Sequence, residues 1–301
     1  MSLSSKIKVA VLRGGQSIGY RASLKTGEHV LSTLREMPET YEPIDIFISI
    51  GGEWHRGGLV EEPHRALRHT DVVWNALHGS YGEDGQVQRI LEGLQIPFTG
   101  SSAVASALSM NKEMAKNLYQ KHALLTPAHA LITKNNLNED RLIHIFRNYL
   151  YPVIVKPTDA GESLGVRPVH TFHELKQAVK ETLNYSPRVL VEEVIKGAEA
   201  SCIVIEKAKG ERLYALLPSS ESKLMVEENK QLEEMAKRAH EALGLRHYSS
   251  SDFIITPKKK IYILETNSLP VFHKDSLIHN SLKSTGWRSR DFVDHILKLA
   301  M

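Results

Sequence analysis

Short apolar runs that end in glycine turns dominate the first hundred residues. The three clearest runs are residues 8–12 (KVAVL), 44–50 (IDIFISI) and 72–77 (VVWNAL). Apolar positions at helical spacing predict helices over 22–34 and 87–94, and a further short strand is expected near 96–99. Strands and helices that alternate in this way are typical of a parallel sheet with helices on both faces. Ligands bind beyond the carboxyl ends of such strands, so we expect the glycine turns that follow the runs to share one rim.

The pattern changes after residue 100, where helices and strands no longer alternate regularly. Helices are predicted over 103–122, 137–149, 172–183, 230–243 and 290–299. Strands are predicted over 151–156, 166–169, 188–193, 199–206, 212–217, 252–255 and 260–265, with 166–169 returning as a hairpin partner and the later strands antiparallel. The fold class is therefore α/β at the start of the chain and α+β afterwards. We expect three lobes, at residues 1–100, 101–187 and 188–301.

Composition and charge narrow the class of protein. Of the 301 residues, 42% are hydrophobic and 24% are charged, which is typical of a globular protein and excludes a disordered, collagen-like or coiled-coil chain. The net charge of +3 gives no reason to expect nucleic acid or a membrane as a partner. The single cysteine, Cys202, favours a reducing compartment, and the chain start lacks the features of a signal peptide. We therefore expect a cytoplasmic protein.

The strongest candidate metal site lies in the last predicted hairpin. Glu265 and Asn267 are two residues apart on one strand, so their side chains share a face. Asp252 lies on the preceding strand, and a hairpin would bring it alongside. Two carboxylates and an amide oxygen are ligands that suit Mg²⁺, which proteins usually hold together with substrate phosphates. An ordinary hairpin with solvated polar residues remains the alternative.

Candidate phosphate-binding groups occur at two lysines and one loop. Lys112 and Lys156 each end or follow an apolar stretch, where an ammonium can act as a point charge on phosphate oxygens. The loop 161–165 carries two glycines and can turn its backbone N–H groups onto phosphates, although it is no Walker A motif. The alternatives are lysines that extend along the surface into solvent and an ordinary turn.

Two further stretches carry candidate binding groups. Glu192 ends one predicted strand and Glu199 begins the next, so either could accept hydrogen bonds from a nucleoside; a charged loop is the alternative. The loop 78–85 (HGSYGEDG) follows a strand and combines glycines, a histidine and acids, as a small-molecule site at a sheet rim would. His78 alone would more often have a structural role.

Taken in order, these motifs resemble the D-alanine–D-alanine ligase family of the ATP-grasp superfamily, of which this chain looks like a divergent member. The order is HGxYGEDG, MNK, VIVKP with a glycine loop, VEExIxGxE and a D…ExN hairpin. The resemblance covers nearly the whole chain. It implies an ATP-grasp fold preceded by a Rossmann-like parallel-sheet domain.

The resemblance also implies a reaction and its residues. A carboxylate would attack the γ-phosphate of ATP to form an acyl phosphate, and an amine would then displace phosphate, giving a dipeptide for peptidoglycan in the cell wall. The implied cofactors are ATP and Mg²⁺, with Mn²⁺ as a substitute; the substrate is D-alanine or another small amino acid, and a homodimer is expected. The metal ligands would be Asp252, Glu265 and Asn267. The nucleotide-binding residues would be Lys112, Lys156, Glu162, Ser163, Glu192, Glu193, Ile195, Glu199 and Lys223. The amino-acid site would include His78, Glu83, Ser276 and Leu277, and the catalytic residues would be Lys156, Ser163, His78 and Arg21.

The sequence departs from the family pattern mainly at the amino-acid end. The family's substrate-binding glutamate is Gly19 here, its oxyanion-binding arginine is Ser250 and its loop serine is Glu162. Val271 replaces a glycine, and the mobile loop is reduced to about 218–228, with Lys223 as its only cation. Losing an oxyanion donor costs about 10²- to 10³-fold in rate. Arg21 and Glu162 are candidate replacements that could pair with each other.

Three functions therefore compete. The first is a ligase with an altered amino-acid site, and the second is an ATP-binding protein or slow ATPase that has lost ligation. The third is a noncatalytic scaffold, which would have no reason to retain Lys112, Lys156 and the three metal ligands.

Overall fold

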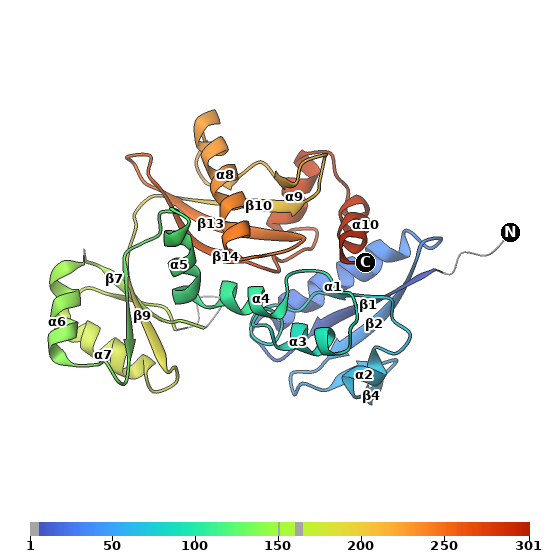
Figure 1. Cartoon of the computed structure of the whole chain (residues 1–301), viewed down its shortest axis with the longest axis horizontal. Helices are drawn as coiled ribbons and strands as arrows, with labels where there is room; N and C mark the ends of the chain where they lie inside the picture. Colours follow the sequence, from blue (N-terminus) through green and yellow to red (C-terminus); the bar gives the residue numbers. More distant parts are fainter. Residues whose placement is uncertain (1–5, 150, 160–164) are drawn as a thin grey trace.

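The computed structural model describes residues 6–149, 151–159 and 165–301. Over these residues the chain forms three β-sheets, each covered by its own helices (Figure 1). The first sheet contains parallel strands and the third is antiparallel, as the hydrophobic pattern predicted. The second sheet is antiparallel as well, although of its pairings only the 166–169 hairpin was predicted. None of the helices in the described ranges is both long and apolar enough to cross a lipid bilayer.

The first sheet has the strand order β4-β3-β2-β1-β5. Its members are β1 (Ile7–Gly14), β2 (Tyr41–Ile48), β3 (Trp54–Arg56), β4 (Leu59–Glu61) and β5 (Val72–Asn75). β1 pairs in parallel with β2 and β5, whereas β3 and β4 extend the sheet as antiparallel hairpins that the sequence did not predict. The strand expected near 96–99 is wrong, because this segment makes only one isolated bridge, between Val73 and Phe98.

Both faces of β1 are buried, which explains its continuous apolar sequence. Val9 and Val11 face α1 (Tyr20–Arg35) and α10 (Ser289–Ala300), and Ala10 and Leu12 face the core that contains α3 (Gln86–Gly93). The short helix α2 (Pro63–Ala66) belongs to that second core. Residues from both ends of the described chain therefore build the first core.

The carboxyl ends of β1, β2 and β5 form one rim, as predicted. The Gly15 N–H donates to the carbonyl of Ile48 at 2.9 Å, and the Ser17 hydroxyl donates to the carbonyl of His78 at 2.5 Å. Gly14 has a φ of +95°, and a Cβ there would lie 2.1 Å from the Ile48 carbonyl oxygen. Only glycine allows this close approach of the two strands.

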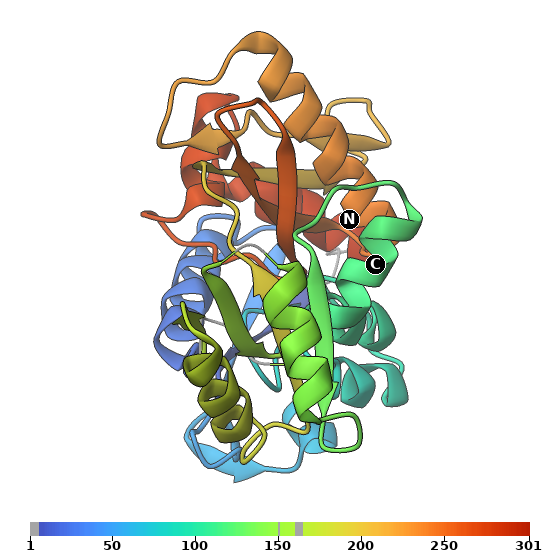
Figure 2. The same cartoon turned by 90° about the vertical axis from the view of Figure 1, so that its left-hand side faces the viewer.

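The second sheet is antiparallel, with the order β6-β9-β7-β8. Its members are β6 (His129–Thr133), β7 (Val153–Pro157), β8 (Arg167–Val169) and β9 (Arg188–Glu193). Helices α6 (Glu139–Asn148) and α7 (Phe172–Thr182) cover its outer face (Figure 2). β8 is the predicted hairpin partner of β7. β6 was not predicted, because a five-residue edge strand with two polar ends carries little hydrophobic signal.

The third sheet, with the order β11-β10-β13-β14, carries the predicted metal hairpin. Its members are β10 (Ala198–Glu206), β11 (Leu213–Ala215), β12 (Ser219–Ser220), which pairs with β10, β13 (Tyr248–Ile255) and β14 (Ile261–Asn267). One face packs against α5 (Lys112–Lys121) and α8 (Val226–Ala242), and the other contributes Ile203 and Tyr248 to the core of the first sheet. A helix that was not predicted, α9 (Leu277–Ser284), follows β14.

The single helix predicted over 103–122 is wrong, because the chain forms two helices there. α4 (Ala103–Met110) ends at Asn111, whose backbone leaves the helical region with φ −80° and ψ 103°. The Asn111 side chain accepts a hydrogen bond from the Met114 N–H and so caps α5. This break makes Lys112 the first residue of a new helix and turns it toward the third sheet.

Candidate active site

Two cavities meet at three residues. A cavity of about 570 Å³ lies between the second and third sheets, and one of about 320 Å³ lies between the third sheet, the loop after β5 and α9. Lys112, Asp252 and Glu265 line both. We call the first the intersheet cavity and the second the rim cavity. A group bound in one can thus meet a group bound in the other at these three side chains.

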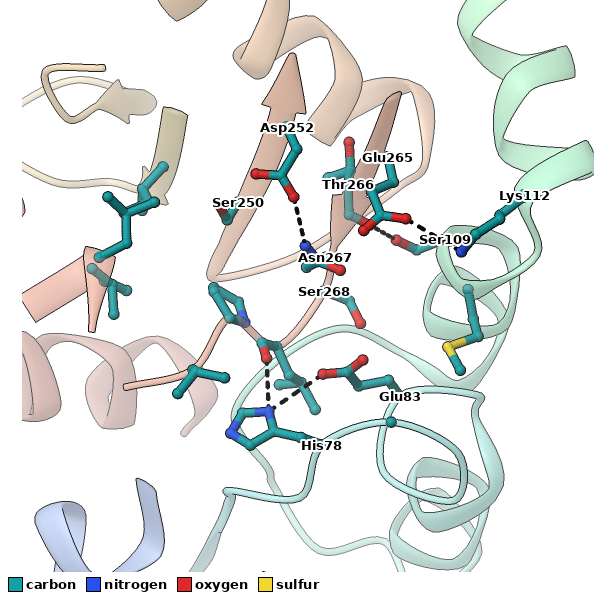
Figure 3. A pocket seen from close by; sticks show the side chains of 18 residues that line it. His78, Glu83, Ser109, Lys112, Ser250, Asp252, Glu265, Thr266, Asn267 and Ser268 are labelled. Carbon is teal, nitrogen blue, oxygen red and sulfur yellow. Dashed lines mark hydrogen bonds and ion pairs between the residues drawn. The ribbon is translucent and has the colours of Figure 1, made fainter. Parts of the chain in front are cut away.

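The candidate metal ligands lie together at this junction (Figure 3). Asp252 is paired with Glu265 across β13 and β14, next to a β-bulge. Asp252 Oδ1 accepts from the Ser201 hydroxyl at 2.6 Å, and Oδ2 accepts from the Asn267 amide at 3.2 Å. Burial, followed by the charge of Glu265, raises the pKa of Asp252 to about 6 despite these hydrogen bonds. Two carboxylates this close disfavour each other's ionisation. A bound cation would compensate their charges, so the pair fits a metal site.

Lys112 faces the same cluster from α5. Its Nζ lies 3.2 Å from Glu265 Oε2, and its backbone N–H donates to the carbonyl of Thr158 at 2.8 Å. The side chain therefore places a positive charge between the two cavities. Within the described chain no three His, Cys, Asp or Glu side chains gather as a metal site, so Asn267 would have to complete the ligand set.

Glu192 forms ion pairs with two lysines at the wall of the intersheet cavity. Its Oε1 lies 3.1 Å from Lys156 Nζ, and its Oε2 lies 2.7 Å from Lys116 Nζ. Burial alone would raise the pKa of Glu192, but the two lysines outweigh it and lower the pKa. Sequence reasoning missed Lys116. Its position four residues after Lys112, on the same face of one helix, was the available signal.

The other predicted nucleotide-binding residues divide into three groups. Glu193, Ile195 and Glu199 line the intersheet cavity, although the Glu193 N–H is already bound to the carbonyl of Ala128. Lys223 lines a separate cavity. Glu162 and Ser163 lie outside the described residues.

His78 connects three segments at the floor of the rim cavity. Its Nδ1 lies 3.1 Å from the carbonyl oxygen of Leu269 and 3.3 Å from Glu83 Oε1, as Figure 3 shows. Its Nε2 lies 2.9 Å from the Thr26 hydroxyl. Because Leu269 presents a carbonyl, Nδ1 carries a hydrogen and donates it, while Nε2 is paired with the Thr26 hydroxyl. The ring is 4% exposed, so it joins α1 to the loops after β5 and β14.

The other residues predicted for the amino-acid site do not all line the rim cavity. Glu83 and Leu277 line the rim cavity. Ser276 does not line it, since its hydroxyl caps α9 by accepting from the His279 N–H. Arg21 is exposed on α1 and lines neither cavity.

Two positions that depart from the family pattern, Ser250 and Val271, line the rim cavity. Val271 forms an apolar wall there with Ile203 and Leu277. Gly19 precedes α1 and offers no side chain. Ser109 is a lining residue that sequence reasoning missed, and its hydroxyl donates to the carbonyl of Thr266.

Comparisons with known proteins identify the family. The family model "D-ala D-ala ligase C-terminus" matches residues 118–217 and 216–298, and "D-ala D-ala ligase N-terminus" matches residues 59–101. The chain belongs to the D-alanine–D-alanine ligase family and is a ligase enzyme with the ATP-grasp fold.

Individual relatives are similar over nearly their full length. D-alanine–D-alanine ligase from Geotalea uraniireducens (strain Rf4) is 33% identical, over 97% of this chain and 95% of its own. The VanG D-Ala:D-Ser ligase from Enterococcus faecalis superimposes with a TM-score of 0.87 and 26% identity, over 99% of this chain and 100% of its own. D-alanine–D-alanine ligase from Bacillus anthracis, solved as a complex with ATP, gives a TM-score of 0.81 and 25% identity, over 98% and 96%.

Proposed function

We propose that this enzyme uses ATP to join two small amino acids, D-alanine first among them, through an acyl-phosphate intermediate. The observation that carries the proposal is the sharing of Lys112, Asp252 and Glu265 by the intersheet and rim cavities. ATP would occupy the first cavity, which Lys112, Lys156 and Glu192 line, and the amino acids would occupy the second. The Bacillus anthracis relative was solved as a complex with ATP. The γ-phosphate would then lie at the junction.

The chemistry requires that negative charges meet without repulsion. A carboxylate oxygen of the first amino acid would attack the γ-phosphorus, and ADP would leave. Lys112 and Lys156 would hold the phosphate oxygens in line for this attack. Asp252, Glu265 and Asn267 would hold Mg²⁺, which supplies charge neutralisation on the phosphates. The amine of the second amino acid would then attack the acyl carbon, lose a proton and expel phosphate.

The rim cavity sets the choice of amino acids. His78 fixes its floor through hydrogen bonds to Thr26 and Leu269, while Ile203, Val271 and Leu277 give it an apolar wall. Ser250 leaves a neutral hydroxyl where the family pattern has an arginine. We infer that the second amino acid is bound differently from the usual family substrate, and the VanG relative, a D-Ala:D-Ser ligase, is a precedent for a different acceptor.

Phosphate release from ATP and Mg²⁺, measured with and without D-alanine and a panel of other amino acids, tests the proposal. Release that depends on an amino acid, with a dipeptide detected by mass spectrometry, would support ligation. Release that is equal without any amino acid would indicate an ATPase instead. We also propose that the enzyme is a homodimer, which analytical ultracentrifugation would test. The chain would divide into three lobes at residues 1–100, 101–187 and 188–301, which limited proteolysis would test.

A further inference from the structure

Lys116 is a buried cation behind the wall of the intersheet cavity. Its side chain is 1% exposed, and Lys116 is not among the residues that line either cavity. Its Nζ lies 2.7 Å from Glu192 Oε2 and donates to the Thr126 hydroxyl at 2.7 Å. An isolated ammonium is costly to bury, so its partners must hold it in this place. Its direct link to the intersheet cavity is therefore the Glu192 carboxylate, which lines that cavity.

Glu192 divides its carboxylate between a hidden and an accessible lysine. Oε2 faces Lys116, and Oε1 accepts from Lys156 at 3.1 Å. Lys156 is 12% exposed and lines the intersheet cavity, so it can reach a bound phosphate. The three groups together carry one surplus positive charge. Without Lys116, the charge of Lys156 would be cancelled by Glu192.

We propose that Lys116 is a positioning residue that holds the Glu192 carboxylate, so that Lys156 can exchange its bond to Glu192 for a bond to a nucleotide phosphate. Breaking a buried ion pair is strongly unfavourable when one charge is left without a partner. Lys116 removes that cost, because Glu192 keeps one cation after Lys156 has moved. This inference rests on the proposed function, and it adds a residue that touches neither ATP nor the amino acids.

A double-mutant cycle separates this role from simple packing. Lys116→Met keeps most of the side-chain volume and removes the charge. In the presence of Glu192 it should weaken binding of Mg²⁺ and a non-hydrolysable ATP analogue by about tenfold, measured by calorimetry. In the Glu192→Gln background, Lys116→Met should weaken analogue binding by less than about twofold, because no carboxylate remains to be neutralised. Lys121→Met, an exposed position on the same helix, is the matched control and should leave binding unchanged.

The pH dependence of analogue binding is a second readout. Burial lowers the pKa of Lys116 to about 8, although Glu192 opposes this shift. Wild-type affinity should therefore fall as the pH rises through about 8 and approach that of Lys116→Met above pH about 9. The charged and titratable groups that act on Lys116 from neighbouring elements are Glu192, Lys156 and His129, and those on the same helix are Lys112 and, through His129, Glu113.

The outcomes distinguish the two proposals. If the wild-type protein binds no ATP analogue, the proposed function fails. If the wild type binds but Lys116→Met costs the same in both backgrounds, the role of Lys116 fails while the proposed function stands. Equal pH profiles for the wild type and Lys116→Met would overturn it as well. Circular dichroism of each variant would establish that a loss of binding is not a loss of fold.

Discussion

His78 Nδ1 lies 3.1 Å from the carbonyl oxygen of Leu269, 191 residues further along the chain. This bond fastens the loop after β5 to the loop after β14, and both loops line the rim cavity. Glu83 and Thr26 complete the contacts of the imidazole. The two halves of the proposed amino-acid site therefore depend on one side chain for their relative position.

His78→Gln should raise the KM for amino acids by about tenfold and leave the KM for ATP nearly unchanged, since misplacing substrates by a small distance costs rate and affinity. Steady-state kinetics with each substrate varied in turn would measure this. Thr26→Val, which removes the partner of Nε2 and an acceptor for the Phe272 N–H but leaves the Nδ1 bond to Leu269, should have a smaller effect in the same direction. Equal changes in both KM values would show that His78 acts on the whole fold instead.

Asp252→Asn should stabilise the metal-free protein and abolish turnover. The Asp252 pKa of about 6 in the folded protein lies above the ordinary value of 3.8, so the stability that this group contributes is greatest below pH 3.8 and is lost as the pH rises through about 6. Removing the charge should raise the free energy of unfolding at neutral pH by at most about 3 kcal/mol. Urea unfolding would measure the gain. Mg²⁺ should raise the Tm of the wild type much more than that of the variant.

Lys156→Ala and Glu265→Gln should each reduce amino-acid-dependent phosphate release by at least about 10²-fold, since both remove charge from the proposed transfer site. A phosphate assay would measure the loss. Lys121→Ala, an exposed lysine on α5, is the control. Full activity in either test variant would remove that residue from the mechanism.

Ser250→Arg should increase kcat/KM for D-alanine as the second substrate by about tenfold, because it restores a donor for the developing oxyanion and the substrate carboxylate. The rim cavity offers about 320 Å³ beside this position. Dipeptide formation under subsaturating D-alanine is the measurement. Ser250→Met, similar in length but neutral, should give no increase.

His247 should make the folded protein sensitive to mild acid. Burial, followed by the charge of Arg246, lowers its pKa to about 4, and its Nδ1 accepts a hydrogen bond from the Gly100 N–H at 3.0 Å. The contribution of neutral His247 to the free energy of unfolding is therefore complete above pH 6.5. It falls by at most about 3 kcal/mol as the pH drops toward 4. His247→Asn should flatten this dependence in urea unfolding, because asparagine tolerates the φ of +67° and can present an acceptor oxygen.

The order of most elements could be predicted because their apolar runs are continuous. The parallel strands, the hairpin that carries Asp252 and Glu265, and the helices that cover the sheets all follow from local pattern. The break at Asn111 could not, because an apolar helix pattern continues through it and only the capping bond reveals the turn. β3, β4 and β6 were missed because strands of three to five residues depend on their neighbours for stability.

The candidate site was predicted as a set of residue types, and the structure adds their partners. Lys116 was overlooked because burial of a lysine depends on Glu192 and Thr126, which lie on other elements. Ser276 was assigned to the amino-acid site from its motif, and the structure adds that its hydroxyl caps α9. Distances across elements, which no local pattern contains, decide such cases.

The packing of α10 on the first sheet has a consequence for synthesis. Tyr41, on β2, donates its hydroxyl to Asp294 of α10 at 2.9 Å, and Phe292 and Ile296 fill the core beside β1 and β5. During synthesis, the strands of the first sheet emerge from the ribosome long before this helix does. The nascent chain must therefore carry an open apolar face until translation has passed residue 300, and a stop codon shortly before α10 would leave that face exposed to chaperones and proteases.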